Sequence, residues 1–177
     1  SALIDLKDKS VVITGAASGI GAATAHLMGV LGARVAASDI DPDGLEEVVA
    51  GIKDAGGTAF SRQVDVTDSQ QVNAFFDAVV EWFGTVDIVV SNAGIGGRQQ
   101  RKTAEHTHED WHNVIAVNQT GVFYTMQAAL GQMMQQGYGS IVNVASLAGL
   151  KPTGYNLSYS ASKFAVIGMT KSAALEY

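Results

Sequence analysis

Cysteine is absent from the 177-residue sequence, which excludes disulfides and zinc sites built on thiolates. Long apolar runs are absent as well, and no stretch approaches the roughly 20 residues that a membrane-spanning helix needs. The first ten residues, SALIDLKDKS, alternate in charge and lack the apolar segment of a secretory signal. These absences predict a cytoplasmic protein without a membrane partner.

Basic residues are also few. The chain has 11 Lys and Arg against 17 Asp and Glu, a formal net charge of −6. A non-specific nucleic-acid binder normally carries the opposite sign, so we expect no nucleic-acid partner. Hydrophobic residues make up 47% and charged residues 16% of the chain, which is typical of a folded globular domain.

Short apolar runs alternate with longer segments of helical periodicity. Strands are expected at 10–15, 34–39, 58–66, 86–94 and 140–146, and helices at 19–33, 42–56, 68–84, 109–136 and from 156 onward. Thr67 and Gln70 suggest a capping box at the start of the third helix. Strand–helix alternation predicts a parallel sheet covered by helices on both faces. The expected fold is one doubly wound, Rossmann-like α/β domain over residues 1–177.

The last residues, KSAALEY, stop inside a helical pattern without a glycine or proline stop signal. The predicted fifth strand, or a neighbour, would also be left as a bare sheet edge, which proteins usually cover. We therefore expect that the chain lacks a carboxy-terminal part.

A glycine-rich turn joins the first strand to the first helix. Glycine permits the sharp backbone angles and the close approach of a pyrophosphate, while the helix that follows offers free N–H groups to an anion. A plain glycine turn is the alternative, but the strand before and the helix after favour a cofactor site. The residues concerned are Thr14, Gly15, Ser18, Gly19, Ile20 and Gly21.

The spacing of this turn, T-G-x-x-x-G-I-G, resembles the cofactor turn of the short-chain dehydrogenase/reductase family, and the resemblance spans nearly the whole chain. Asp39, at the end of the second predicted strand, can accept hydrogen bonds from the adenosine ribose of NAD. It would repel the 2′-phosphate of NADP by about 4 kcal/mol at ~4 Å and an effective dielectric of about 20. We therefore expect NAD, although Asp39 could instead cap the helix that begins near Pro42.

The family resemblance adds further contacts to the cofactor. Ser91 departs mildly from the N-N-A-G sequence that the family usually has at this point. We expect Asn92 to tie neighbouring strands together and Gly94 to admit the cofactor, although structural turn roles would explain these residues almost as well. The expected contacts are Ile40, Asp65, Val66, Asn92, Ala93 and Gly94.

Tyr159 and Lys163 in YSASK lie one helical turn apart and so share a helix face. A phenol of pKa ~10 is a poor base at neutral pH. An ammonium about 4–6 Å away would favour the phenolate by roughly 3–4 kcal/mol, which suits proton transfer during hydride exchange with an alcohol.

By resemblance, Tyr159 is the general acid/base, and Lys163 also holds the nicotinamide ribose. Ser146 hydrogen-bonds the substrate oxygen and Asn118 supports a water relay, which implies hydride transfer between NAD(H) and a secondary alcohol or ketone. Taken singly, these residues could be a strand-end cap, a core amide and a helix surface pair. Their order along the chain favours the catalytic interpretation.

The sequence HEDWH, with His108, Glu109 and His112, matches the H-E-x-x-H motif of zinc hydrolases. A catalytic zinc needs a third protein ligand, and no recognisable spacing supplies one. Metal-dependent hydrolysis is therefore the second hypothesis. An inactive cofactor-binding fragment is the third.

The substrate pocket is expected to be mainly apolar. Its predicted lining is Ile95, Gly96, Leu147, Ala148, Leu150 and Tyr155. Arg98, Arg101 and Lys102 could meet an acidic substrate, but a solvated basic surface explains them better. The resemblance also implies a homodimer or homotetramer built on the two long helices.

Overall fold

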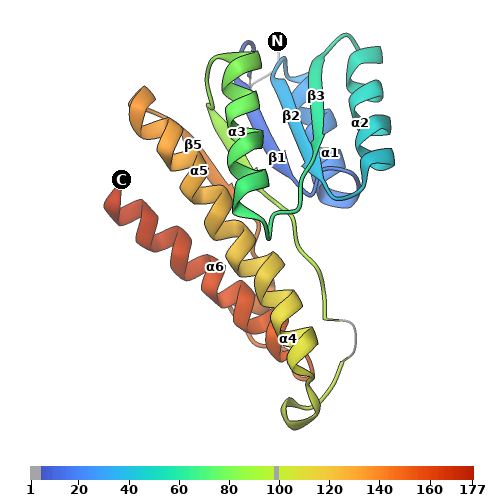
Figure 1. Ribbon diagram of the computed structural model, residues 1–177, viewed down its shortest axis with the longest axis vertical. Coiled ribbons are helices and arrows are strands. Elements are labelled where there is room, and N and C mark those ends of the chain that lie inside the picture. The colour runs from blue at the N-terminus through green and yellow to red at the C-terminus, as the bar shows by residue number, and fades with distance from the viewer. Residues whose placement is uncertain (1–4, 98–99) are drawn as a thin grey trace.

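Five parallel strands form a single sheet in the order β3-β2-β1-β4-β5 (Figure 1). The computed structural model describes residues 5–97 and 100–177. The chain runs outward from β1 to β3 and then crosses back to β4, so the winding reverses between β1 and β4. Such a switch point is where open α/β sheets bind ligands. The strands are β1 Ser10–Thr14, β2 Arg34–Asp39, β3 Thr58–Gln63, β4 Ile88–Ser91 and β5 Ser140–Asn143.

Helices cover both faces of the sheet, as the nearly continuous apolar strands predict. Helices α1 (Gly19–Val30) and α2 (Pro42–Asp54) pack on one face, where Ile13 belongs to their core. Helices α3 (Ser69–Phe83) and α5 (Gly121–Gln136) pack on the other face, where Val12 belongs to theirs. Successive residues of β1 therefore enter opposite cores, and both are fully buried.

Helix α6 (Leu157–Glu176) lies beside α5 and packs Val166 against Val122 and Met126 (Figure 1). Helix α4 (His108–Ile115) and the first turns of α6 extend beyond the sheet. Among the described residues, no helix combines the length and the apolar character needed to cross a membrane.

The segment predicted as one helix from 109 to 136 is helical throughout but not uniformly α-helical. A π-helical turn, η2 (Ala116–Thr120), lies between α4 and α5. Single π turns inside α-helices are rare and often occur at functional sites. Asn118, a predicted catalytic residue, lies within this turn.

Two predicted strands end early because the strands they pair with end. β3 stops at Gln63 where β2 stops at Asp39, and β5 stops at Asn143 where β4 stops at Ser91. Asp65, Val66 and Ser146 therefore lie in loops beyond the strands that were expected to contain them. The observed β4 is shorter at both ends than the predicted strand 86–94, because the N–H groups of Val86 and Asn92 donate to the side chains of Gln136 and Thr14 rather than to the backbone of a neighbouring strand.

The predicted capping box at α3 is wrong. Asp68, not Thr67, is the N-cap, and its carboxylate accepts hydrogen bonds from the backbone N–H groups of Gln70 and Gln71. Thr67 instead donates its hydroxyl proton to Asp65. Two capping residue types stand side by side in the sequence, and the backbone places only the second at the helix start.

Asp87 is buried at the opposite end of the sheet from the strand carboxyl termini. It accepts hydrogen bonds from the backbone N–H of Ser10 at 2.8 Å and from Thr85 Oγ1 at 2.9 Å, and Lys9 Nζ lies 3.6 Å away. Burial alone would raise its pKa, but these hydrogen bonds outweigh burial and hold the pKa of Asp87 below its ordinary value.

Candidate active site

A cleft of about 900 Å³ opens at the carboxyl ends of β1, β2 and β4, at the switch point of the sheet. It brings together most of the predicted site residues from segments far apart in the sequence. The predicted residues that line it are Gly15, Ser18, Gly19, Ile20, Asp39, Ile40, Asp65, Val66, Asn92, Ala93, Gly94, Tyr159 and Lys163.

The glycine turn is shaped for close approach of a ligand. Gly15 and Gly19 have positive φ angles of 66° and 54°, a region that favours glycine. A Cβ on Gly21 would lie 2.0 Å from the carbonyl oxygen of Gly15, so α1 can pack here only with glycine. No heavy atom lies within 4 Å of where a Cβ of Gly19 would stand, and the first turn of α1 carries no acidic residue. The amino end of α1 is therefore open to an anion.

Thr14 and Asn92 lock the turn to the end of β4. The Thr14 hydroxyl accepts hydrogen bonds from the backbone N–H groups of Asn92 and Ala93. The Asn92 side chain donates to the backbone carbonyls of Thr14 and Gly15, at 3.2 and 2.9 Å. Asn92 thus ties two neighbouring strands together. Thr14 does not line the cleft itself but holds in place two residues that do, Asn92 and Ala93.

Asp39 lies at the rim of the cleft and holds the glycine turn. One carboxylate oxygen accepts the backbone N–H of Ala17 at 3.0 Å, and the other accepts that of Asp41 at 3.2 Å. The cap of α2 is Asp41, whose side chain accepts from the first turn of the helix, so Asp39 is not the helix cap. Among the described residues lining the cleft, Lys163 is the only Lys or Arg.

Tyr159 and Lys163 occupy the first turns of α6 and both line the cleft. Lys163 Nζ lies 5.7 Å from the centre of the Tyr159 ring and donates a hydrogen bond to the carbonyl of Val144 at 2.9 Å. Only 4% of Lys163 is exposed, and this burial lowers its pKa. Lys163 is thus a buried cation beside the ring of Tyr159.

Asn118 is fully buried and clamps the loop that follows β4. Its side chain accepts the N–H of Ile95 at 2.8 Å and donates to the carbonyl of the same residue at 2.9 Å. It also donates to the Ser162 hydroxyl of α6 at 3.3 Å. A Cβ on Gly94 would lie 3.3 Å from Asn118 Oδ1 and 3.6 Å from Lys163 Nζ, so the missing side chain of Gly94 leaves room for both. The π turn presents Asn118 at this point.

Ser146 follows Ala145, which lines the cleft, but does not itself line it. It caps the short 3₁₀ helix η3 (Leu147–Gly149), where its oxygen accepts the N–H of Ala148 at 3.1 Å. A hydroxyl that accepts one hydrogen bond keeps its own proton to donate.

The predicted substrate lining is only partly brought to the cleft. Ile95 and Gly96 line it, whereas Leu147, Leu150 and Tyr155 are exposed outside it. Ala148 is buried and cannot line an open pocket, because η3 packs against α6. In the predicted basic cluster, Arg98 lies outside the described residues.

Asp110, Asn113 and Val117 line the cleft but were not predicted from the sequence. They are spaced three and four residues apart, so they lie on one face of a helix. The last of them, Val117, directly precedes Asn118. That spacing is the signal that could have identified them.

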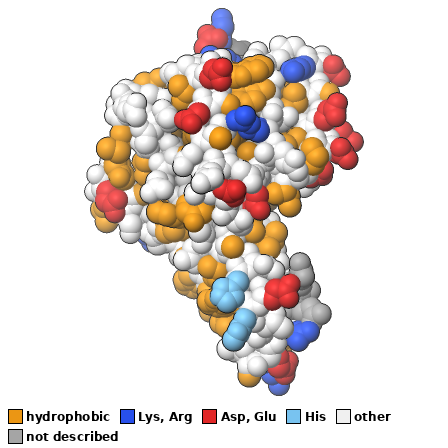
Figure 2. Space-filling model, in the orientation of Figure 1, with side chains coloured by type: hydrophobic (Ala, Val, Ile, Leu, Met, Phe, Trp, Pro, Cys, Tyr) orange, Lys and Arg blue, Asp and Glu red, His pale blue; other side chains and the backbone are white. Residues whose placement is uncertain are grey.

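The H-E-x-x-H motif lies on α4, where His108 and His112 are both exposed. Figure 2 shows histidine side chains at the surface in the lower part of the molecule, where α4 lies. The Nδ1 atom of His112 lies 2.6 Å from the backbone carbonyl of His108. Among the described residues, no three His, Asp or Glu side chains could hold a metal together, so the geometry gives the hydrolase hypothesis no support.

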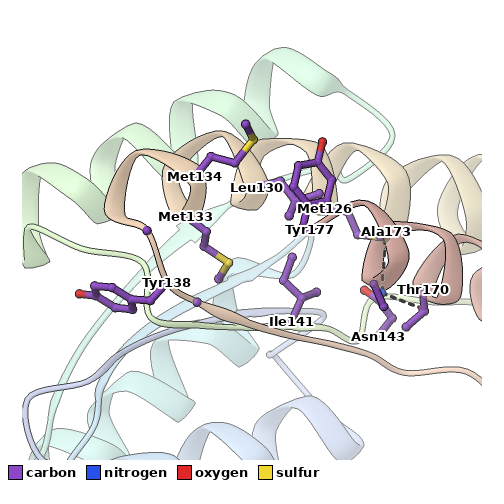
Figure 3. A pocket seen from close by; sticks show the side chains of 13 residues that line it. Met126, Leu130, Met133, Met134, Tyr138, Ile141, Asn143, Thr170, Ala173 and Tyr177 are labelled. Carbon is purple, nitrogen blue, oxygen red and sulfur yellow. Dashed lines mark hydrogen bonds between the residues drawn. The ribbon is translucent and has the colours of Figure 1, made fainter.

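A second groove of about 470 Å³ lies between α5, β5 and α6 (Figure 3). It is lined mainly by apolar side chains, including Met126, Met133 and Ile141. Two of its polar side chains bond to each other, since Asn143 donates a hydrogen bond to Thr170 Oγ1 at 2.9 Å. The groove contains no acid–base pair, so we assign the chemistry to the cleft.

The profile of the short chain dehydrogenase family matches residues 9–177. The chain belongs to the short-chain dehydrogenase/reductase family. The family and the fold predicted from the sequence are therefore confirmed.

Three relatives of this family member illustrate the similarity. It is 42% identical over 175 residues to 2,5-dichloro-2,5-cyclohexadiene-1,4-diol dehydrogenase LinX of Sphingobium indicum, covering 97% of this chain and 68% of that protein. The crystal structure of levodione reductase superposes with a TM-score of 0.94 at 36% identity, over 97% of this chain and 67% of that one. The crystal structure of NAD⁺-bound xylitol dehydrogenase also superposes with a TM-score of 0.94 at 36% identity. The match covers 97% of this chain and 65% of that one.

This short-chain dehydrogenase/reductase thus spans about two thirds of the length of these relatives. They are named as dehydrogenases or reductases, and one is described with NAD⁺ bound. The coarse function that follows is that of an oxidoreductase with a nicotinamide cofactor.

Proposed function

We propose that the protein transfers a hydride between NAD(H) and a secondary alcohol or ketone, with Tyr159 as the general acid/base. One observation carries the proposal. Tyr159 and the buried Lys163 line the same cleft as the glycine turn, although more than a hundred residues separate the two motifs. A proton-transferring group and a dinucleotide site therefore share one crevice.

The cleft suits a dinucleotide along its length. The glycine turn and the amino end of α1 would hold the pyrophosphate, and Asp39 would accept hydrogen bonds from the adenosine ribose. Ile40, Val66 and Ala93 would enclose the adenine, and Lys163 would hold the nicotinamide ribose. The bound nicotinamide supplies the hydride acceptor or donor.

We infer a preference for NAD over NADP from the charges at the rim. The Asp39 carboxylate would repel a 2′-phosphate, and no Lys or Arg other than Lys163 is present among the described cleft residues to offset that repulsion. The hydrogen bonds that Asp39 accepts from the backbone N–H groups of Ala17 and Asp41 keep the carboxylate in place.

The proton path uses four side chains. The Tyr159 oxygen takes the proton of the substrate alcohol during oxidation and returns it during reduction. The Lys163 ammonium stabilises the phenolate. The Ser146 hydroxyl donates to the substrate oxygen, and Asn118 supports a water relay toward Lys163.

Assembly through the two long helices is a further part of the proposal. Phe123 of α5 and Phe164 of α6 are 46% and 45% exposed, which supports a homodimer or homotetramer built on these helices. Light scattering coupled to size exclusion measures this directly, and a monomeric mass at micromolar concentration would contradict it.

A panel of secondary alcohols with NAD⁺, and of ketones with NADH, tests the proposal on the full-length protein by absorbance at the nicotinamide band. Tyr159→Phe should lower kcat at least about a thousandfold, because the proton carrier is lost. NADH affinity, followed by fluorescence, should stay within about twofold. Tyr138→Phe, at an exposed tyrosine far from the cleft, is the matched control.

Retained turnover in Tyr159→Phe would contradict the assignment of Tyr159. Binding of NADH without turnover of any alcohol or ketone by the unaltered protein would favour the inactive cofactor-binding alternative.

A further inference from the structure

A buried polar cluster lies beside the cleft, where the loop after β4 meets α4 and the start of α6. It consists of Asp110, Asn156 and Ser158 around Gly97, with His106 beside Asp110, and we call it the latch. His106 Nδ1 lies 3.7 Å from Asp110 Oδ2, and these side chains are only 6% and 13% exposed. A Cβ on Gly97 would lie 3.1 Å from Asp110 Oδ2, 3.5 Å from Asn156 Oδ1 and 3.8 Å from Ser158 Oγ. Polar atoms from two helices therefore surround one residue of the loop.

The latch is a poor arrangement for stability alone. Ser158 is fully buried, and neither its hydroxyl nor His106 Nε2 has a hydrogen-bond partner among the described residues. Buried polar groups without partners destabilise a fold, and apolar side chains would fill the same space at lower cost. Rules of packing are most often broken where a structure serves function.

The latch connects directly to the proposed catalytic groups. Gly97 lies two residues beyond Ile95, whose N–H and carbonyl are both bound by Asn118. Asp110 lines the cleft, and Ser158 precedes Tyr159 in the first turn of α6. The loop is also tied to the segment before α6, because the Arg101 N–H donates to the carbonyl of Tyr155 at 3.0 Å.

We propose that His106 and Asp110 form a positioning pair that holds the loop Ile95–Gly97 against the first turn of α6. The pair thereby sets how tightly the substrate is held beside Tyr159. This inference rests on the proposed function of the cleft. The pair acts on the loop both before and during the reaction, so its loss should raise KM more than it lowers kcat.

A double-mutant cycle on the full-length protein tests the pair. His106→Leu and Asp110→Asn should each raise KM for the alcohol about tenfold and leave kcat within about threefold. The double variant should be no worse than either single variant, because both changes break the same interaction. His106→Gln, which keeps a polar group, should recover most of the affinity. His108→Ala, at an exposed histidine of the same segment, should match the unaltered protein.

Amide hydrogen exchange gives a readout that does not depend on turnover. In His106→Leu, amides of residues 95–97 and 156–160 should exchange about tenfold faster, and His108→Ala should leave them unchanged. If His106→Leu does not fold, His106→Gln and Asp110→Asn provide the same comparison. Unchanged amide exchange rates in His106→Leu, or effects on KM that add in the double variant, would refute the proposed pairing of His106 with Asp110.

The two proposals fail differently. If the unaltered protein turns over no alcohol or ketone, the proposed function fails, while the exchange experiment still decides whether the latch holds the loop.

Discussion

Removing the charge of Lys163 tests whether that charge activates Tyr159. Lys163→Met keeps a long, unbranched side chain in the buried site and deletes the ammonium. Its Nζ lies 5.7 Å from the centre of the Tyr159 ring, and a positive charge beside a phenol favours the phenolate.

The expected result is a loss that depends on pH. With the ammonium absent, proton removal from the alcohol by Tyr159 loses its electrostatic support. At neutral pH, kcat for alcohol oxidation should fall at least about tenfold, and the deficit should be smaller at alkaline pH, where proton removal needs less electrostatic help. The measurement is kcat at saturating NAD⁺ from about pH 6 to about pH 10. Lys171→Met, at an exposed lysine of the same helix, is the control.

A deficit that stays constant across this range would refute the electrostatic argument. Lys163 would then act through cofactor binding or packing, and the affinity for NADH would have to account for the whole loss. A deficit with both a constant and a pH-dependent part would measure the two roles separately.

Two further predictions concern carboxylates. Asp39→Ala should lower the ratio of kcat/KM for NAD⁺ over NADP⁺ at least about tenfold, because repulsion of the 2′-phosphate is lost; Asp41→Ala should destabilise α2 by about 1 kcal/mol and leave that ratio unchanged. Asp87→Asn should lower the melting temperature by about 4–8 °C at neutral pH, because buried charged hydrogen bonds weaken. The pKa of Asp87 is held low in the folded state, so this stabilisation is present above its unfolded pKa and is lost as the pH falls through the folded value. The difference in melting temperature between Asp87→Asn and the unaltered protein should therefore become smaller in acid. A difference that stays constant with pH would show that the charge of Asp87 is not what stabilises the fold.

Local patterns predicted the parts of the fold and site that depend on neighbouring residues. The bounds of β2, at 34–39, follow from its apolar run alone. The glycine turn was predictable because it needs backbone freedom at fixed positions along the sequence. The pairing of Tyr159 with Lys163 was predictable because residues four apart share one face of a helix. Such features require no knowledge of distant contacts.

The remaining features depend on tertiary contacts that the sequence does not display. The ends of β3 and β5 are set by the lengths of their partner strands. The π turn brings Asn118 to Ile95, 23 residues away in the chain, yet the apolar pattern of 109–136 reads as one continuous helix. Likewise, Asp110 and Ser158 approach Gly97 only because α4 and α6 pack together.

The burial that makes Lys163 useful should also make it destabilising. Burial lowers the pKa of Lys163, so between its folded pKa and its unfolded value near 10.5 the unfolded chain binds more protons. The cost of burying the ammonium is thus present in full at neutral pH and is relieved as the pH rises through that window. Lys163→Met removes this cost but leaves the Val144 carbonyl without its donor, so we expect a net gain of about 2–6 °C in melting temperature near neutral pH. The gain should diminish toward about pH 10. A variant that is inactive and no more stable than the unaltered protein would show that the buried ammonium is already fully compensated in the folded state.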